Sequence, residues 1–222
     1  MRPGTALRSR VVGPTLAELA GAGGVLLDVG GYDGSVAASV PRAGGLVIVV
    51  DVDRPGLAKA RRQGVAAVAA SGTALPFASG SVGLALSLDV LTCLEPAEAE
   101  QVYPEIGRVL RPGGRLLATE VDERYSLPFV DTGAAFARWN VHTAGFTSGR
   151  LAELLKGGRL RVVEHRMFYG LLTRLSYSVL FFLARPLRGA RLKRRAWELA
   201  GRIERRWCVS PQAHFVVAVK EP

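Results

Sequence analysis

One stretch near the N-terminus, Val25 to Gly34, limits the folds that this chain of 222 residues can adopt. A short apolar run passes directly into a turn that holds three glycines between positions 30 and 34. Such a run is typical of a strand that is buried on both faces of a parallel sheet. Glycines at the following turn let the backbone approach a ligand closely, and a helix that starts after it offers unpaired N–H groups. The stretch therefore predicts a strand, a ligand-binding turn and a crossover helix over residues 35–40.

A second apolar run, Leu46 to Val50, ends at the acidic residue Asp51. Asp51 lies 17 residues after Gly34, which is close to the spacing at which an acid reaches a ribose in a βαβ unit. A carboxylate can accept hydrogen bonds from both ribose hydroxyls. The alternative is that Asp51 or Asp53 only caps a helix that begins near Pro55. We assign ribose binding to Asp51 and the capping role to Asp53.

The glycine turn and two later segments form a recognisable set. A nicotinamide site requires G-x-G-x-x-G, and from Gly30 that pattern fails because Tyr32 and Ser35 replace the second and third glycines. The chain instead has D-x-G-x-x-x-G from Asp28 to Gly34. Downstream it holds L-P-F at residues 75–77 and E-I-G-R-V-L-R-P-G-G-R-L-L at residues 105–117.

Together these segments resemble class I S-adenosylmethionine-dependent methyltransferases of the small-molecule type. The first motif of that family is usually D/E-x-G-x-G-x-G, and Tyr32 replaces its middle glycine here. Ser71 stands where the family usually has an acid that contacts the adenine amino group, and Gly83 replaces a later acid. A serine keeps an acceptor but loses the charge, so we expect weaker adenine selection at Ser71.

The resemblance implies both a fold and a cofactor site. The expected fold is α/β and doubly wound, with a mostly parallel seven-stranded sheet in the order 3-2-1-4-5-7-6 and an antiparallel last strand. The implied cofactor is S-adenosylmethionine. The residues implied to bind it are Asp28, Gly30, Gly31, Tyr32, Gly34, Asp51, Val52, Ser71, Gly72, Thr73, Leu88 and Asp89.

The rest of the chain is read as one Rossmann-like domain over residues 1–222 with two embellishments. Residues 122–146 show no clean periodicity and are predicted to form an acceptor lid. Residues 166–211 are predicted to form a helical insertion before the last strand, with an apolar first half and a basic second half. Residues 185–206 hold nine basic residues against two glutamates, which is +7 of the formal net charge of +10.

The composition of the insertion leaves two interpretations open. An apolar segment followed by a basic amphipathic helix, here within residues 167–206, is typical of contact with an anionic membrane surface. The alternative is a lid helix whose arginines are simply solvated. The longest apolar stretch, 175–184, is far shorter than the roughly 20 residues of a membrane-spanning helix. No secretory leader and no metal-ligand spacing are seen, so we expect a cytoplasmic protein without a metal, with peripheral contact to the inner membrane face left open.

The implied chemistry is methyl transfer, for which the protein mainly aligns donor and acceptor and excludes water. A general base would assist a hydroxyl acceptor. The candidates are Asp122 and His142, with Glu120 as a further acid at the end of the fifth strand.

Three function classes follow from these features. The first is a methyltransferase that acts on a small-molecule or lipid-like acceptor. The second is an RNA methyltransferase that uses the basic insertion to track phosphates. The residues after the fourth strand, S-L-D-V at 87–90, lack the Asn/Asp-Pro-Pro-Tyr/Phe pattern of base-amino methyltransferases. The third is a non-catalytic protein with a degenerate cofactor fold that binds a membrane or a partner.

Overall fold

The computed structural model describes residues 3–20, 24–40, 45–126, 145–179 and 210–222, and single positions at 128, 129, 131, 132, 134, 199, 202 and 203. Its strands are β1 (Val25–Val29), β2 (Leu46–Asp51), β3 (Ala66–Ala69), β4 (Val82–Leu88), β5 (Leu110–Val121), β6 (Leu160–Phe168) and β7 (Ala213–Lys220). Its helices are α1 (Pro3–Ala20), α2 (Arg54–Arg62), α3 (Pro96–Val109), α5 (Ser148–Gly157) and α6 (Leu171–Tyr177), with short 3-10 turns η1 (Ala37–Ser39) and η2 (Leu91–Cys93).

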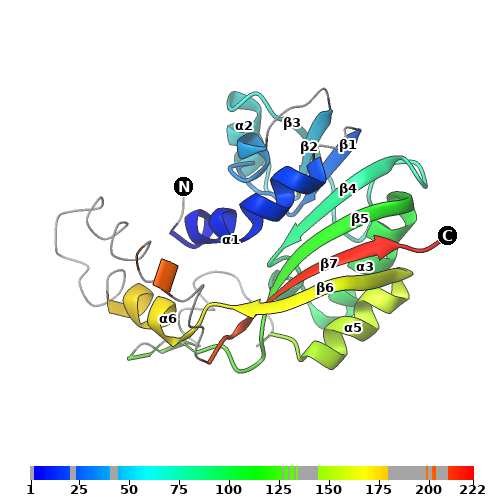
Figure 1. Cartoon of the computed structure of the whole chain (residues 1–222). Coiled ribbons are helices and arrows are strands. Elements are labelled where there is room, and N and C mark those ends of the chain that lie inside the picture. The colour runs from blue at the N-terminus through cyan, green and yellow to red at the C-terminus, as the bar shows by residue number, and fades with distance from the viewer. Residues whose placement is uncertain are drawn as a thin grey trace.

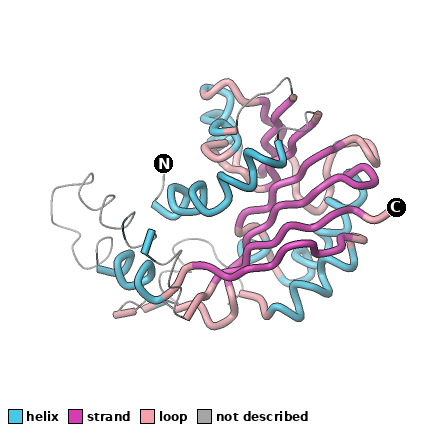
Figure 2. Tube along the Cα trace, viewed as in Figure 1, coloured by secondary structure: helices cyan, strands magenta, loops and turns pink. Residues whose placement is uncertain are grey.

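The seven strands form one twisted sheet in the order β3-β2-β1-β4-β5-β7-β6 (Figure 1). β1 lies between β2 and β4 and is parallel to both, and β4 is parallel to β5. β7 runs antiparallel to β5 on one side and to β6 on the other. Figure 2 shows the sheet between α1 on one face and α3 and α5 on the other. The predicted fold class and strand order are confirmed.

Two apolar cores lie on the two faces of the sheet, because successive side chains of a strand point to opposite faces. The first core joins α3 and α5 to one face through Tyr103, Ile106 and Leu155, which are 0–1% exposed. The second core joins α1 and α2 to the other face through residues such as Leu16 and Leu57. Burial on both faces explains why β1, β2 and β4 read as continuous apolar runs.

Helix caps lie where the sequence predicts them. The side chain of Asp53 accepts a hydrogen bond from the backbone N–H of Gly56 at 2.5 Å and so begins α2. The hydroxyl of Thr147 accepts from the N–H of Arg150 at 3.0 Å and so begins α5. In each case one of the unpaired N–H groups of the first helical turn is satisfied by the cap. The capping interpretation of Asp53 is confirmed.

Two elements differ from the sequence-based expectation. The crossover after β1 was expected to be a helix over residues 35–40, but the structure shows only the 3-10 turn η1. Residues Leu160 to Val163 predict a sixth strand of four residues, but β6 continues to Phe168. The added residues include Glu164 and Arg166, which are exposed and form an ion pair at 3.2 Å. Because β6 is an edge strand, it tolerates exposed polar side chains. In the sequence, the same polar residues look like the end of the strand.

The two family segments at residues 75–77 and 105–117 are bound to each other. A carboxylate oxygen of Glu105 accepts the N–H of Leu75 at 2.7 Å. The guanidinium of Arg108 donates to the carbonyls of Leu75 and Phe77, each at 2.9 Å, and to Glu105 at 2.7 Å. These charge-assisted hydrogen bonds fix the connection between β3 and β4 against α3. The hydrogen bond from Arg108 holds the pKa of Glu105 below its usual value.

We predict that Arg108→Ala lowers the free energy of unfolding by about 1–2 kcal/mol, because it removes charged donors from two backbone carbonyls. Chemical denaturation near neutral pH measures this change. A carboxyl group with a depressed pKa in the folded state contributes stability above its unfolded pKa and loses it as the pH falls through the folded pKa. The difference between wild type and variant should therefore shrink in acid. Arg111 is an exposed neighbour, so Arg111→Ala is the matched control. Equal stabilities of both variants would contradict the stabilising role assigned to Arg108.

Candidate functional site

Neighbouring residues pack so closely against the turn after β1 that the turn requires glycine. Gly30 has a φ of +68°, and a Cβ there would lie 2.7 Å from Cγ2 of Val90 in the loop after β4. A Cβ on Gly31 would lie 2.6 Å from the carboxyl group of Asp28. The turn and the loop after β4 therefore meet at the carboxyl edge of the sheet, where ligands of open α/β sheets bind.

Asp51 at the end of β2 faces this turn. One carboxylate oxygen accepts the N–H of Tyr32 at 2.8 Å, and the other accepts the N–H of Asp53 at 2.8 Å. A carboxylate has about four acceptor positions, so the half-buried Asp51 retains capacity for a ligand hydroxyl. The next residue, Val52, is 72% exposed although it is apolar. The acid, held by two backbone N–H groups, suits a sugar, and the exposed apolar side chain beside it suits a planar base.

Tyr32 takes the place of a family glycine and has a φ of +48°, in the region that favours glycine. Its ring lies against the first turn of α2, since a Cβ on Gly56 would meet ring carbons at 2.7 and 2.9 Å. Lys59 donates to the tyrosine hydroxyl at 3.3 Å. The substitution is thus accommodated on α2, and the backbone of the turn keeps the conformation that a glycine would adopt.

The segment after β3 is brought against the end of β1. A Cβ on Gly72 would lie 3.0 Å from Cγ1 of Val29. The hydroxyls of Ser71 and Thr73 lie 2.8 Å apart, and the N–H of Thr73 donates to Ser71 at 3.1 Å. All three residues are half-buried. The expected adenine contact at Ser71 stays a prediction, with its hydroxyl oriented by Thr73.

Asp89 follows β4 with a φ of +56°. Its N–H donates to the carbonyl of Thr119 at 2.7 Å, and its carboxylate accepts from the hydroxyl of Thr119 at 2.8 Å. Leu88 before it is buried. The structure thus brings the expected cofactor residues of β1, β2, β3 and β4 to one edge of the sheet.

The acids at the end of β5 have opposite electrostatic character. Glu120 is fully buried, and burial followed by the charge of Asp89 raises its pKa well above the usual value. Burial alone would raise the pKa of Asp122 as well, but the hydrogen bonds and charge of Arg124, at 2.7 Å, outweigh it and hold the pKa below the usual value. The other expected base, His142, lies outside the described residues.

Two histidines form a polar connection from the neighbourhood of Asp122 to the protein surface. Nε2 of His214, which is 0% exposed, lies 2.8 Å from the carbonyl oxygen of Phe146 and 3.4 Å from the carboxylate of Asp122. Its Nδ1 lies 3.0 Å from Nε2 of the exposed His165. Since Nε2–H of His214 donates to Phe146, its Nδ1 accepts from His165 in the neutral ring. Sequence reasoning missed this pairing because the two histidines lie on different strands.

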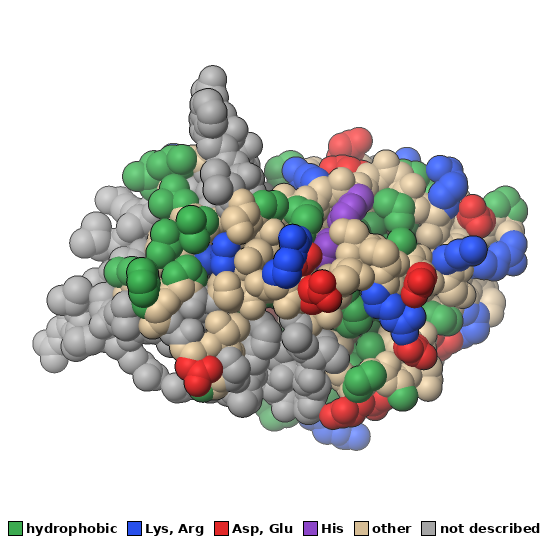
Figure 3. All heavy atoms as spheres, turned by 90° about the horizontal axis from the view of Figure 1, so that it is seen from below, with side chains coloured by type: hydrophobic (Ala, Val, Ile, Leu, Met, Phe, Trp, Pro, Cys, Tyr) green, Lys and Arg blue, Asp and Glu red, His purple; other side chains and the backbone are tan. Residues whose placement is uncertain are grey.

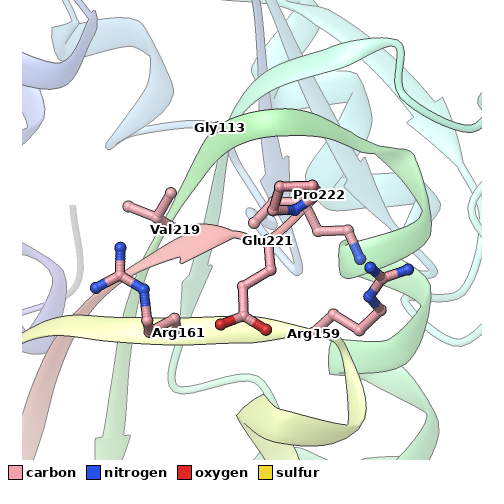
Figure 4. Close-up of a pocket in the computed structure, with 7 residues that line it drawn as sticks. Gly113, Arg159, Arg161, Val219, Glu221 and Pro222 are labelled. Carbon is pink, nitrogen blue, oxygen red and sulfur yellow. The ribbon is translucent and has the colours of Figure 1, made fainter.

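A separate recess lies at the opposite end of the sheet (Figure 4). It is lined by Arg159, Arg161, Lys220 and Glu221, among others, and Figure 4 shows the carboxylate of Glu221 between the two arginines. Among the residues that the structure describes, no group of three or more His, Cys, Asp or Glu side chains could hold a metal ion. None of the helices in the same part of the chain is long and apolar enough to cross a bilayer.

Comparison with known proteins identifies the class. A family model described as "Methyltransferase domain" matches residues 27–118. An uncharacterized methyltransferase of Mycobacterium avium is 44% identical over 98 residues, which are 42% of this chain and 38% of that protein. A counterpart in Mycolicibacterium paratuberculosis is equally similar over 37% of its length. The matched region thus spans well under half of both relatives.

Solved structures share the fold over nearly the whole chain. The geranyl diphosphate C-methyltransferase of Streptomyces coelicolor superposes with a TM-score of 0.68 over 97% of this chain and 77% of that one, at 16% identity. The [4+2]-cyclase SpnF gives a TM-score of 0.65 over 96% of this chain and 81% of that one, at 22% identity. Residues 27–118 therefore match a methyltransferase domain, and the chain has the fold of solved methyltransferase structures. Both findings support the expected family.

We predict that Asp51→Ala weakens binding of S-adenosylhomocysteine by about 1.5–3 kcal/mol, because it removes a charged acceptor from the ribose site. Isothermal titration calorimetry measures the dissociation constant. Asp53→Ala is the matched control, since it removes the α2 cap and costs about 1 kcal/mol of stability without touching the ligand. Equal dissociation constants for wild type and Asp51→Ala would show that the ribose assignment is wrong.

Proposed function

We propose that the chain transfers a methyl group from S-adenosylmethionine to a small-molecule or lipid-like acceptor. The observation that carries this proposal is the convergence at the carboxyl edge. There the glycine turn meets Val90, and the anchored carboxylate of Asp51 lies beside the exposed Val52. A matching methyltransferase domain over residues 27–118 supports it.

The residues at this edge fit the cofactor. The turn at Gly30 and Gly31 has no Cβ and packs closely on Val90 and Asp28, Asp51 would hold the ribose, and Val52 and Ser71 would contact the base. When bound, S-adenosylmethionine supplies an already activated methyl group. The protein then has to hold donor and acceptor in line and keep water away.

The acceptor side lies toward the ends of β4 and β5. Asp122, whose pKa is low, is an anion at neutral pH, and together with His142 it is the base we propose for a hydroxyl acceptor. Residues 122–146 are the proposed lid. Structural neighbours that are named for methylation of geranyl diphosphate support a small-molecule acceptor.

The direct test is calorimetry of the purified chain with S-adenosylmethionine and S-adenosylhomocysteine. We expect binding of both with a rise in Tm, because a ligand that binds only the folded state stabilises it. Titrations without heat and without a thermal shift would instead favour the non-catalytic interpretation of the fold. Strongly salt-dependent binding of tRNA would favour the RNA-directed alternative.

We further propose that the insertion contacts an anionic membrane surface, from which an apolar acceptor could be taken. Apolar side chains are exposed around α6 and farther along the insertion, at Leu171, Leu172, Val179, Leu199 and Ile203. Figure 3 shows hydrophobic side chains gathered at the end of the molecule that carries α6. The +7 charge of residues 185–206 is complementary to anionic lipid headgroups.

Vesicle sedimentation tests this second proposal. We expect wild type to bind vesicles that contain phosphatidylserine far better than neutral vesicles at low salt. A double variant, Leu171→Ser and Leu172→Ser, should weaken binding about tenfold or more, because each leucine loses about 1.5–3 kcal/mol of burial at most. Leu46→Ser, on a leucine that is 54% exposed on β2, is the control. A wild-type chain that ignores anionic vesicles at low salt rules the proposal out.

A further inference from the structure

A group of buried polar atoms lies beneath the loop after β4 and is not used by the function proposed above. Ser87 of β4, Tyr103 of α3 and Glu120 of β5 are each 0% exposed. The Ser87 and Tyr103 hydroxyls lie close to each other without a well-aligned hydrogen bond, and one carboxyl oxygen of Glu120 has no hydrogen-bond partner. Buried polar groups are rarely left unpaired, so this cluster requires a physical reason.

The other carboxyl oxygen of Glu120 is fully engaged. It accepts the N–H of Val90 at 3.2 Å and the N–H of Leu91 at 3.1 Å. These two residues continue the loop from Asp89, which has a positive φ, into η2. Val90 is also the side chain that faces the glycine turn at Gly30. Glu120 therefore holds from below the loop that forms one wall of the carboxyl-edge crevice.

The surroundings of Glu120 favour the uncharged acid. Asp89 from the loop above and Asp122 just after β5 are acidic, and Tyr103 lies near Glu120 from α3. On β7 the opposite residue is His214, whose two ring nitrogens are taken by Phe146 and His165. None of the described contacts brings a lysine or an arginine to Glu120. Burial and the charge of Asp89 both raise its pKa.

We propose that Glu120 is a positioning residue that works as a neutral carboxylic acid: its carbonyl oxygen fixes the N–H groups of Val90 and Leu91, and its O–H points into the Ser87–Tyr103 cluster. The acid thereby sets the distance between the loop after β4 and the glycine turn. The effect of Glu120 on cofactor affinity rests on the function proposed above, whereas the effect of Glu120 on the loop does not.

The test compares Glu120→Gln with Glu120→Leu. Glutamine keeps a neutral carbonyl acceptor of the same length, and leucine keeps the volume but removes the acceptor. We expect hydrogen exchange at the Val90 and Leu91 amides, followed by NMR, to speed up about tenfold or more in Glu120→Leu and to change little in Glu120→Gln. S-adenosylhomocysteine should bind about tenfold more weakly to Glu120→Leu and within about twofold of wild type to Glu120→Gln.

Leu155→Ala is the control for destabilisation in general, because Leu155 is 1% exposed in α5 and packs in the core away from the crevice. It should lower Tm without a selective effect on the two amides. Unchanged exchange at both amides in Glu120→Leu, or the same acceleration in Glu120→Gln, would overturn the positioning role. A wild-type chain that binds no S-adenosylhomocysteine would overturn the proposed function and leave the exchange result to decide the role of Glu120.

The neutral state has a separate readout that does not require Glu120→Leu to fold. An acid whose pKa is raised in the folded state takes up protons on folding, so stability is lost as the pH rises from its unfolded pKa to its folded pKa. The Glu120→Gln variant has no acid at this position, so it does not lose stability in this way. We expect the Tm of Glu120→Gln minus that of wild type to rise from about pH 4.5 to about pH 8. A difference that stays constant or falls over this range would show that Glu120 is ionised in the folded chain.

Discussion

The approach of two backbone segments at Gly30 and Val90 is the constraint on which the rest of the site depends. No side chain larger than hydrogen fits at Gly30, because a Cβ would lie 2.7 Å from Val90. Both segments are held from outside the contact: the turn through the N–H of Tyr32 on Asp51, and the loop through Val90 and Leu91 on Glu120. The contact between the turn and the loop is therefore anchored on each side by a carboxyl group from a neighbouring strand.

The two carboxyl groups lie in different surroundings within one fold. Asp51 is half-buried at a strand end and accepts hydrogen bonds from two backbone amides. Glu120 lies within the core, where desolvation favours the protonated form. Asp122, only two residues farther along the chain, is paired with Arg124 and has its pKa lowered. Three acids with different surroundings thus lie at one sheet edge: one bound to backbone amides, one buried in the core and one paired with an arginine.

Much of this architecture is predictable from sequence, and the exceptions have physical causes. Continuous apolar runs revealed β1, β2 and β4, and the capping roles of Asp53 and Thr147 followed from local chemistry. The hydrogen bonds from Arg108 to the carbonyls of Leu75 and Phe77 join residues about 30 positions apart and leave no local pattern in the sequence. The R-V-L-R-P-G-G segment therefore did not reveal them. The raised pKa of Glu120 depends first on burial, which sequence periodicity does not report. His142 and most of the proposed lid lie outside the described residues.

The reversed direction of β7 has a further consequence for how this scaffold diversifies. β6 ends at Phe168 and β7 begins at Ala213, and these two residues are paired neighbours in the sheet. The intervening segment therefore departs from and returns to one point on the carboxyl edge of the sheet, beside the end of β5. Its length and composition can change without altering the register of any strand. Chains that share this sheet can thus diverge in this segment while all seven strands keep their pairing.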